Sequence, residues 1–101
     1  MYDVITIKAD SNILRVEMKK QPTLDIIHQA VGGSVEMVPH FNKYNGRPVT
    51  VAYYNEDGRS MNLKFNALAT QAWLLCLHGG PLRYQPQLFG DVLIVMPTSN
   101  A

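Results

Sequence analysis

The chain has 101 residues, a net charge of +1 and a hydrophobic fraction of 47%. A chain of this length is expected to form one domain, and this hydrophobic fraction is too high for a disordered one. The balanced charge gives no electrostatic case for binding nucleic acid or an anionic membrane surface. The one cysteine, Cys76, excludes an internal disulfide and a cysteine-rich zinc site.

The sequence also lacks the patterns that direct a protein into or across a membrane. No apolar run approaches the roughly 20 residues that a membrane-spanning helix needs. The first residues, Met-Tyr-Asp-Val, lack the basic flank that opens a signal sequence. We therefore expect no membrane partner and a cytoplasmic location.

Two strands are predicted at the start of the chain. Residues 4–8 are rich in β-branched side chains, which favour strands. Residues 13–18 alternate, so that Leu14, Val16 and Met18 share one face and two charged residues share the other. A period of two with one charged face is typical of a half-buried strand. We expect these two strands to form a hairpin.

A short helix and a third strand follow. Thr23 is a suitable N-cap for an apolar stripe at helical spacing over residues 24–31. Gly32-Gly33 provides the stop, because glycine tolerates the left-handed conformation beyond a helix end. Residues 34–38 then alternate as a strand.

The middle of the chain predicts a polar loop over residues 39–48 and a hairpin beyond it. Residues 49–54 alternate strongly, and Asp57-Gly58 is a favoured hairpin turn. Residues 61–65 alternate again and are expected to be the returning strand.

A second helix and a last strand complete the prediction. Asn66 is a good N-cap for residues 67–77, which are apolar on nearly all sides and are therefore expected to be buried on most sides. On this reading Leu75→Asp should prevent folding by burying an unpaired charge. Residues 92–96 are five consecutive apolar residues, typical of a strand buried on both faces.

The fold class that follows is α+β. The order is strand, strand, helix, strand, strand, strand, helix, strand, in a single domain over residues 1–97 with a flexible tail at 98–101. We expect a mixed sheet with both helices packed on one face. The opening strand-strand-helix-strand is similar to a β-grasp arrangement, an analogy that implies no function.

The residues that carry chemistry are sparse. His28, His40 and His78 do not stand at metal-ligand spacing with one another or with Cys76. Cys76 lies in an apolar segment, where a cysteine acts as a small hydrophobe. The two Gly-Gly pairs follow helices, whereas a phosphate-binding loop precedes one. We therefore expect no metal, no cofactor and no catalytic residue.

Tyrosine and arginine in the loops indicate a surface for a protein partner, because these residues anchor protein interfaces. The expected contact residues are Tyr44, Arg47, Arg83 and Tyr84. These four, together with Lys43, Tyr53, Tyr54 and Arg59, are the nearest approach to a basic, aromatic nucleic-acid surface. Their charges are few, so we do not expect nucleic acid as the partner.

Four short motifs occur in order: Val-Gly-Gly-Ser-Val-Glu at 31–36, Asn-Glu-Asp-Gly at 55–58, Asn-Ala-x-Ala-Thr at 66–70, and Gly-Asp at 90–91 before an apolar strand. Together they resemble a family of small domains of unknown function that is common in bacteriophages, plasmids and other mobile elements. The resemblance implies an accessory protein of a phage or mobile element, and we expect its partner to be a host or phage protein. Such proteins often bind and block a host protein, including defence systems of the restriction or CRISPR type.

The same motifs offer an alternative function as a small-ligand or nucleotide-binding domain. Its site would be lined by Glu36, Asn55, Asn66 and Thr70. A structural interpretation is favoured for both asparagines, as a turn residue and a helix cap. The sequence leaves the oligomeric state and the identity of the partner open.

Overall fold

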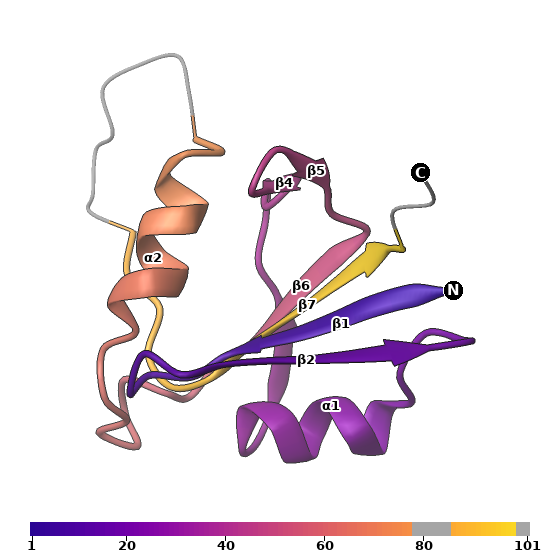
Figure 1. Ribbon diagram of the computed structural model, residues 1–101. Helices are drawn as coiled ribbons and strands as arrows, with labels where there is room; N and C mark the ends of the chain where they lie inside the picture. The colour runs from indigo at the N-terminus through magenta and orange to yellow at the C-terminus, as the bar shows by residue number, and fades with distance from the viewer. Residues whose placement is uncertain (78–85, 99–101) are drawn as a thin grey trace.

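Five strands form one antiparallel sheet through the middle of the molecule (Figure 1). The computed structural model describes residues 1–77 and 86–98. The strands, in spatial order, are β2 (Ile13–Met18), β1 (Tyr2–Ile7), β7 (Val92–Pro97), β6 (Val51–Asn55) and β3 (Val35–Met37). β1 is paired along its whole length with β2 and with β7, so these three strands form the longest part of the sheet.

The α+β class and the single compact domain are confirmed. The Cα radius of gyration is 13.1 Å, the value expected for one domain of about 100 residues. The opening order of two strands, a helix and a strand is also as predicted. The sheet is not mixed, however, because every pairing in it is antiparallel.

The two helices, α1 (Leu24–Val31) and α2 (Ala67–Leu74), cover opposite faces of the sheet, so the prediction that both pack on one face is wrong. Alternate residues of β7 explain the arrangement: Ile94 packs in the cluster that contains Trp73 of α2, whereas Leu93 packs with Ile27 of α1. Because successive side chains of a strand point to opposite faces, an apolar strand like β7 needs a cover on each side.

β2 is exposed on both faces, although the sequence predicts a half-buried strand. Leu14 and Val16 lie on the α1 side of the sheet, yet they are 53% and 58% exposed. α1 packs against the inner strands through Ile27 and Val31, and its cover does not extend over this edge.

The predicted strand at 61–65 does not form, apart from an isolated bridge between Phe65 and Phe89. β6 already has β7 on one side and β3 on the other, so it has no free edge for a returning strand. Residues 55–63 instead form successive turns, with hydrogen bonds from Gly58 N–H to Asn55 O and from Leu63 N–H to Gly58 O.

A small hairpin, β4 (Lys43–Tyr44) and β5 (Arg47–Pro48), stands in the segment predicted as a loop. Its two turn residues, Asn45 and Gly46, both have positive φ, at 51° and 77°. Two positive φ angles in a two-residue turn match the strand twist of a tight hairpin, and Asn-Gly is the pair that favours them.

The helix caps are as predicted. Thr23 Oγ1 accepts a hydrogen bond from Ile26 N–H, and Gly32 ends α1 with φ of 83°. Asn66 Oδ1 accepts from Ala69 N–H at the start of α2. α2 ends at Leu74, earlier than predicted, and Leu75 is 75% exposed. The expectation that Leu75→Asp buries a charge is therefore wrong.

β7 ends at Pro97, and the residue after it stays bonded to the sheet, since Thr98 N–H donates to Met1 O at 3.1 Å. The rest of the predicted tail, residues 99–101, lies outside the described residues, as does His78. Within the described part of the chain, no helix is long and apolar enough to cross a membrane.

Candidate functional site

A buried carboxylate holds two arginines at one side of the sheet, on the face that α2 covers. Asp3 is 1% exposed, and its two oxygens accept hydrogen bonds from Arg15 Nη2 at 2.7 Å and Arg47 Nη2 at 2.9 Å. Arg47 Nη2 also donates to Pro97 O at 2.8 Å. Burial acts to raise the pKa of the Asp3 carboxyl, but the hydrogen bonds and charges of Arg47 and Arg15 outweigh it, so the pKa is lowered.

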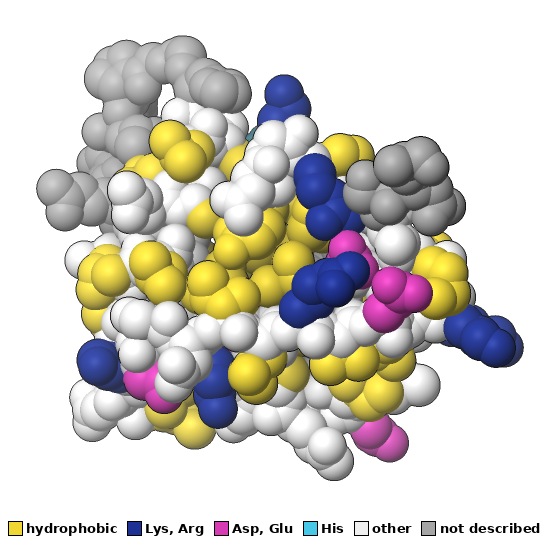
Figure 2. All heavy atoms as spheres, in the orientation of Figure 1, with side chains coloured by type: hydrophobic (Ala, Val, Ile, Leu, Met, Phe, Trp, Pro, Cys, Tyr) yellow, Lys and Arg dark blue, Asp and Glu magenta, His cyan; other side chains and the backbone are white. Residues whose placement is uncertain are grey.

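Beside these arginines lies a hollow of about 300 Å³ with an apolar floor. Ile5 of β1 and Met96 of β7 form the floor, and both are buried in the α2-side core. A second hollow, of about 220 Å³, adjoins it and shares Tyr44 and Asn45 as lining residues. Figure 2 shows hydrophobic side chains gathered in a depression between α2 and the β4–β5 hairpin, with charged side chains beside it.

We refer to the two adjoining cavities as the Tyr44 hollow. Its lining residues are Ile5, Ile13, Arg15, Lys43, Tyr44, Asn45, Gly46, Arg47, Ala72, Leu75, Cys76 and Met96. The rim carries exposed apolar side chains, since Ile13 is half exposed and Leu75 is mostly exposed. The side chain of Lys43 is also at the surface.

The structure brings two of the four predicted partner-binding residues into this hollow. Tyr44 packs partly against the core, and Arg47 is tied to Asp3 and Pro97. Arg83 and Tyr84, the other two, lie outside the described residues. Because Tyr44 and Arg47 also support the fold, alanine at these positions would test stability as well as binding.

Sequence reasoning missed the other members of the hollow. Asp3 and Arg47 are 44 residues apart, and no local pattern predicts their contact. One indication of this contact was present in the sequence. Asp3 stands beside β-branched strand residues, where its carboxylate is expected to be buried, and a buried carboxylate needs a charged partner. The sequence pattern predicts Leu75 in the core, whereas the structure places it at the surface.

The alternative ligand-binding set is not brought together. Asn66 is fully buried, and its Nδ2 donates to Ile7 O at 2.8 Å and to Gly90 O at 2.9 Å. Thr70 Oγ1 accepts from Leu88 N–H at 3.0 Å. These contacts fasten α2 to the sheet and to the segment before β7, which is the structural role favoured for Asn66.

Asn55 is likewise buried and structural. Its Oδ1 accepts from Asp57 N–H at 2.9 Å, and its Nδ2 donates to Val31 O at 3.3 Å. The side chain thus joins the turn after β6 to the end of α1. Glu36 is exposed on β3, where its Oε1 accepts from the adjacent Met37 N–H.

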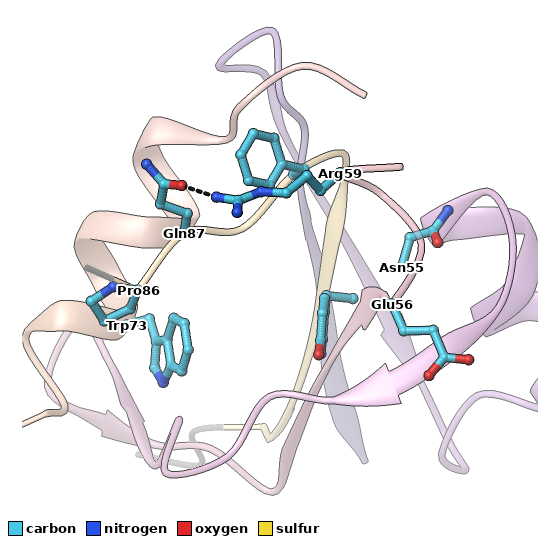
Figure 3. A pocket seen from close by; sticks show the side chains of 8 residues that line it. Asn55, Glu56, Arg59, Trp73, Pro86 and Gln87 are labelled. Carbon is cyan, nitrogen blue, oxygen red and sulfur yellow. Dashed lines mark hydrogen bonds between the residues drawn. The ribbon is translucent and has the colours of Figure 1, made fainter. Parts of the chain in front are cut away.

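A separate cavity of about 280 Å³ lies near Asn55. Figure 3 shows Trp73, Pro86 and Gln87 on one side of it and Asn55 and Glu56 on the other, with Arg59 hydrogen-bonded to Gln87. The Arg59 guanidinium also lies 5.1 Å from the centre of the Phe89 ring.

Tyr54 lines the same cavity. Burial raises the pKa of its hydroxyl, and the charges of Glu36 and Glu56 add to the effect. Of the alternative set, Asn55 lines the cavity and Glu36 lies opposite Tyr54 across the strands. Asn66 and Thr70 do not line it.

His28 and Cys76 each make a hydrogen bond with a backbone carbonyl. His28 Nδ1 lies 2.7 Å from Gly33 O, and the buried Cys76 thiol donates to Lys43 O at 3.1 Å. His40 is exposed, with φ of 63°. Over residues 1–77 and 86–98, no group of three or more His, Cys, Asp or Glu side chains could hold a metal ion.

No family model, curated protein or solved structure matches this chain. The resemblance to mobile-element domains therefore stays a prediction from the sequence motifs, and the function is argued below from the geometry of the site.

Proposed function

We propose that this protein is a non-enzymatic module that binds a segment of another protein in the Tyr44 hollow. The observation that carries the proposal is the juxtaposition of an apolar floor with two guanidinium groups held by the buried carboxylate of Asp3. Side chains that are already fixed in place lose little conformational entropy on binding. Tyrosine and arginine are also the residues that most often dominate the energy of protein interfaces.

The chemistry of the hollow defines the kind of segment that fits it. An aliphatic or aromatic side chain would bury apolar surface against Ile5, Met96 and Leu75. A neighbouring carboxylate would meet Arg15, Arg47 and Lys43 at the rim. Each guanidinium has five N–H donors, and the contacts with Asp3 and Pro97 use only some of them. The partner is therefore a segment with an apolar residue beside an acidic one.

Four buried polar side chains support a binding role over a catalytic one, because they are occupied in holding the fold. The Cys76 thiol joins the end of α2 to the β4–β5 hairpin. Asn55, Asn66 and Thr70 each fasten one segment of backbone to another. Inhibition of a host protein, which the sequence resemblance implies, remains a prediction about the identity of the partner.

Selection from a random peptide display library tests the proposal. We expect the enriched peptides to carry Leu, Ile or Phe next to Asp or Glu. Two variants on the rim, Lys43→Glu and Leu75→Asp, should weaken peptide binding by about tenfold, because each places a carboxylate where the peptide presents an acidic or an apolar side chain. Both side chains are exposed, so folding should be unaffected.

Two matched controls make the same chemical changes elsewhere. Lys20→Glu alters an exposed lysine after β2, and Leu24→Asp alters an exposed leucine of α1 on the opposite face of the sheet. Both should bind the peptides like the unmodified protein. Failure to enrich any peptide would overturn the proposal, and so would equal affinity for the rim variants and the controls.

A further inference from the structure

We propose that β2 pairs with β2 of a second copy of this chain, antiparallel and with Val16 on the two-fold axis. The two sheets would then form one continuous sheet across a symmetric dimer. The inference does not rest on the proposed function, because it uses the backbone edge of β2, although the side chains of Ile13 and Arg15 also line the Tyr44 hollow.

β2 is an edge strand of the sheet, and nothing in residues 1–77 and 86–98 pairs with its outer side. It has six residues, none of them proline, and Ile13, Leu14 and Val16 are 50–58% exposed. Long, apolar edges of this kind are templates for pairing with another strand, and most proteins block them. The opposite edge, β3, has only three residues and offers little backbone to pair with.

The backbone of β2 presents a defined set of groups to a partner. Lys8 N–H donates to Asn12 O at 2.8 Å, so the pair of Lys8 and Asn12 is a hydrogen-bonded pair of the β1–β2 hairpin. Such pairs alternate along an antiparallel ladder, and the even-numbered residues of β2 therefore bond to β1. The N–H and C=O groups of Ile13, Arg15 and Glu17 consequently point away from the sheet.

Side-chain charge selects one register for a symmetric pair. With Val16 opposite itself, Arg15 faces Glu17 of the second copy on the α2 side, and this ion pair occurs twice. Leu14 faces Met18 of the second copy on the other side, also twice. Opposite charges in such positions stabilise a strand pair, and like charges destabilise it.

The neighbouring symmetric registers are less favourable. A shift that centres the pair on Arg15 places two arginines opposite each other. A shift that centres it on Glu17 opposes two glutamates and sets Arg15 against Lys19. All three registers pair the outward groups of odd-numbered residues with one another, as the backbone requires, so the side chains decide between them. A single strand pair is a small interface, so we expect a weak dimer in the micromolar range.

Cysteine cross-linking tests the register directly. Val16 would form a pair without backbone hydrogen bonds on the axis, where the two Cα atoms are about 4.5 Å apart, within disulfide range. Val16→Cys should therefore give a disulfide-linked dimer under mild oxidation. Leu14→Cys is the matched control, being similarly exposed. In this register the two Leu14 residues are offset by four residues along the strand, which is about 13 Å. They should therefore not cross-link.

Sedimentation of the unmodified chain at micromolar to millimolar concentration gives the second readout. We expect a monomer–dimer equilibrium that Glu17→Lys shifts about tenfold toward the monomer. Glu36→Lys makes the same change on β3 and should leave the equilibrium unchanged. A chain that stays monomeric at all concentrations would overturn the proposal. Cross-linking of Leu14→Cys as efficient as that of Val16→Cys would also overturn it.

Discussion

Replacing Asn66 should cause a large loss of stability, because this one side chain makes three buried hydrogen bonds. Asn66→Ala removes the acceptor for Ala69 N–H, and loss of a helix N-cap costs about 1 kcal/mol. It also removes the donors to Ile7 O and Gly90 O. A buried polar group that loses its partner costs about 1–3 kcal/mol. Taking the lower value for each carbonyl, the total is about 3 kcal/mol.

Urea unfolding followed by circular dichroism measures this effect. Asn66→Ser keeps a capping oxygen, so it should be destabilised by about 2 kcal/mol, about 1 kcal/mol less than Asn66→Ala. Asn42→Ala changes an exposed asparagine and should stay within about 0.5 kcal/mol of the unmodified protein. Unchanged stability of Asn66→Ala would refute the reasoning. Equal losses for the serine and alanine variants would show that the cap contributes nothing.

Three further perturbations have expected outcomes. Because the pKa of Asp3 is below its ordinary value of 3.8 in the folded state, its contribution to stability should be complete above that pH and lost as the pH falls below it. Urea unfolding at a series of decreasing pH values should show the free energy of unfolding falling below pH 3.8. Asp3→Asn should remove this pH dependence. In thermal unfolding, Trp73→Ala should cost about 3–5 kcal/mol, whereas Leu75→Asp, two residues along, should be nearly neutral because Leu75 is exposed. Gly58→Ala should lower the melting temperature, since the added Cβ would lie 2.8 Å from Phe89 O.

Local sequence patterns predicted most elements, because their causes are local. The caps at Thr23 and Asn66 and the stop at Gly32 depend on neighbouring residues, and all three are confirmed. The pair Asn45-Gly46 also carried the pattern of a tight hairpin, although the segment around it was predicted as a loop. The apolar run of β7 predicted burial on both faces, which already implied that the two helices cover opposite sides.

The errors concern contacts that the sequence does not encode locally. Alternation at 61–65 is typical of a strand, but a strand needs a free neighbour, and β6 has none. Leu75 follows an apolar helix, and only the packing of α2 decides which of its sides is covered. The Tyr44 hollow depends on the ion pair between Asp3 and Arg47, and these two residues are 44 positions apart in the sequence.

The central claim is that the Tyr44 hollow is the binding site, and backbone amide NMR of the labelled protein tests it most directly. The protein is titrated with the tightest peptide from the display selection. We expect the amide shifts of Lys43, Tyr44 and Leu75 to change together, with the same affinity at each. Changes confined to Glu56, Arg59 and other residues of the separate cavity would contradict the account.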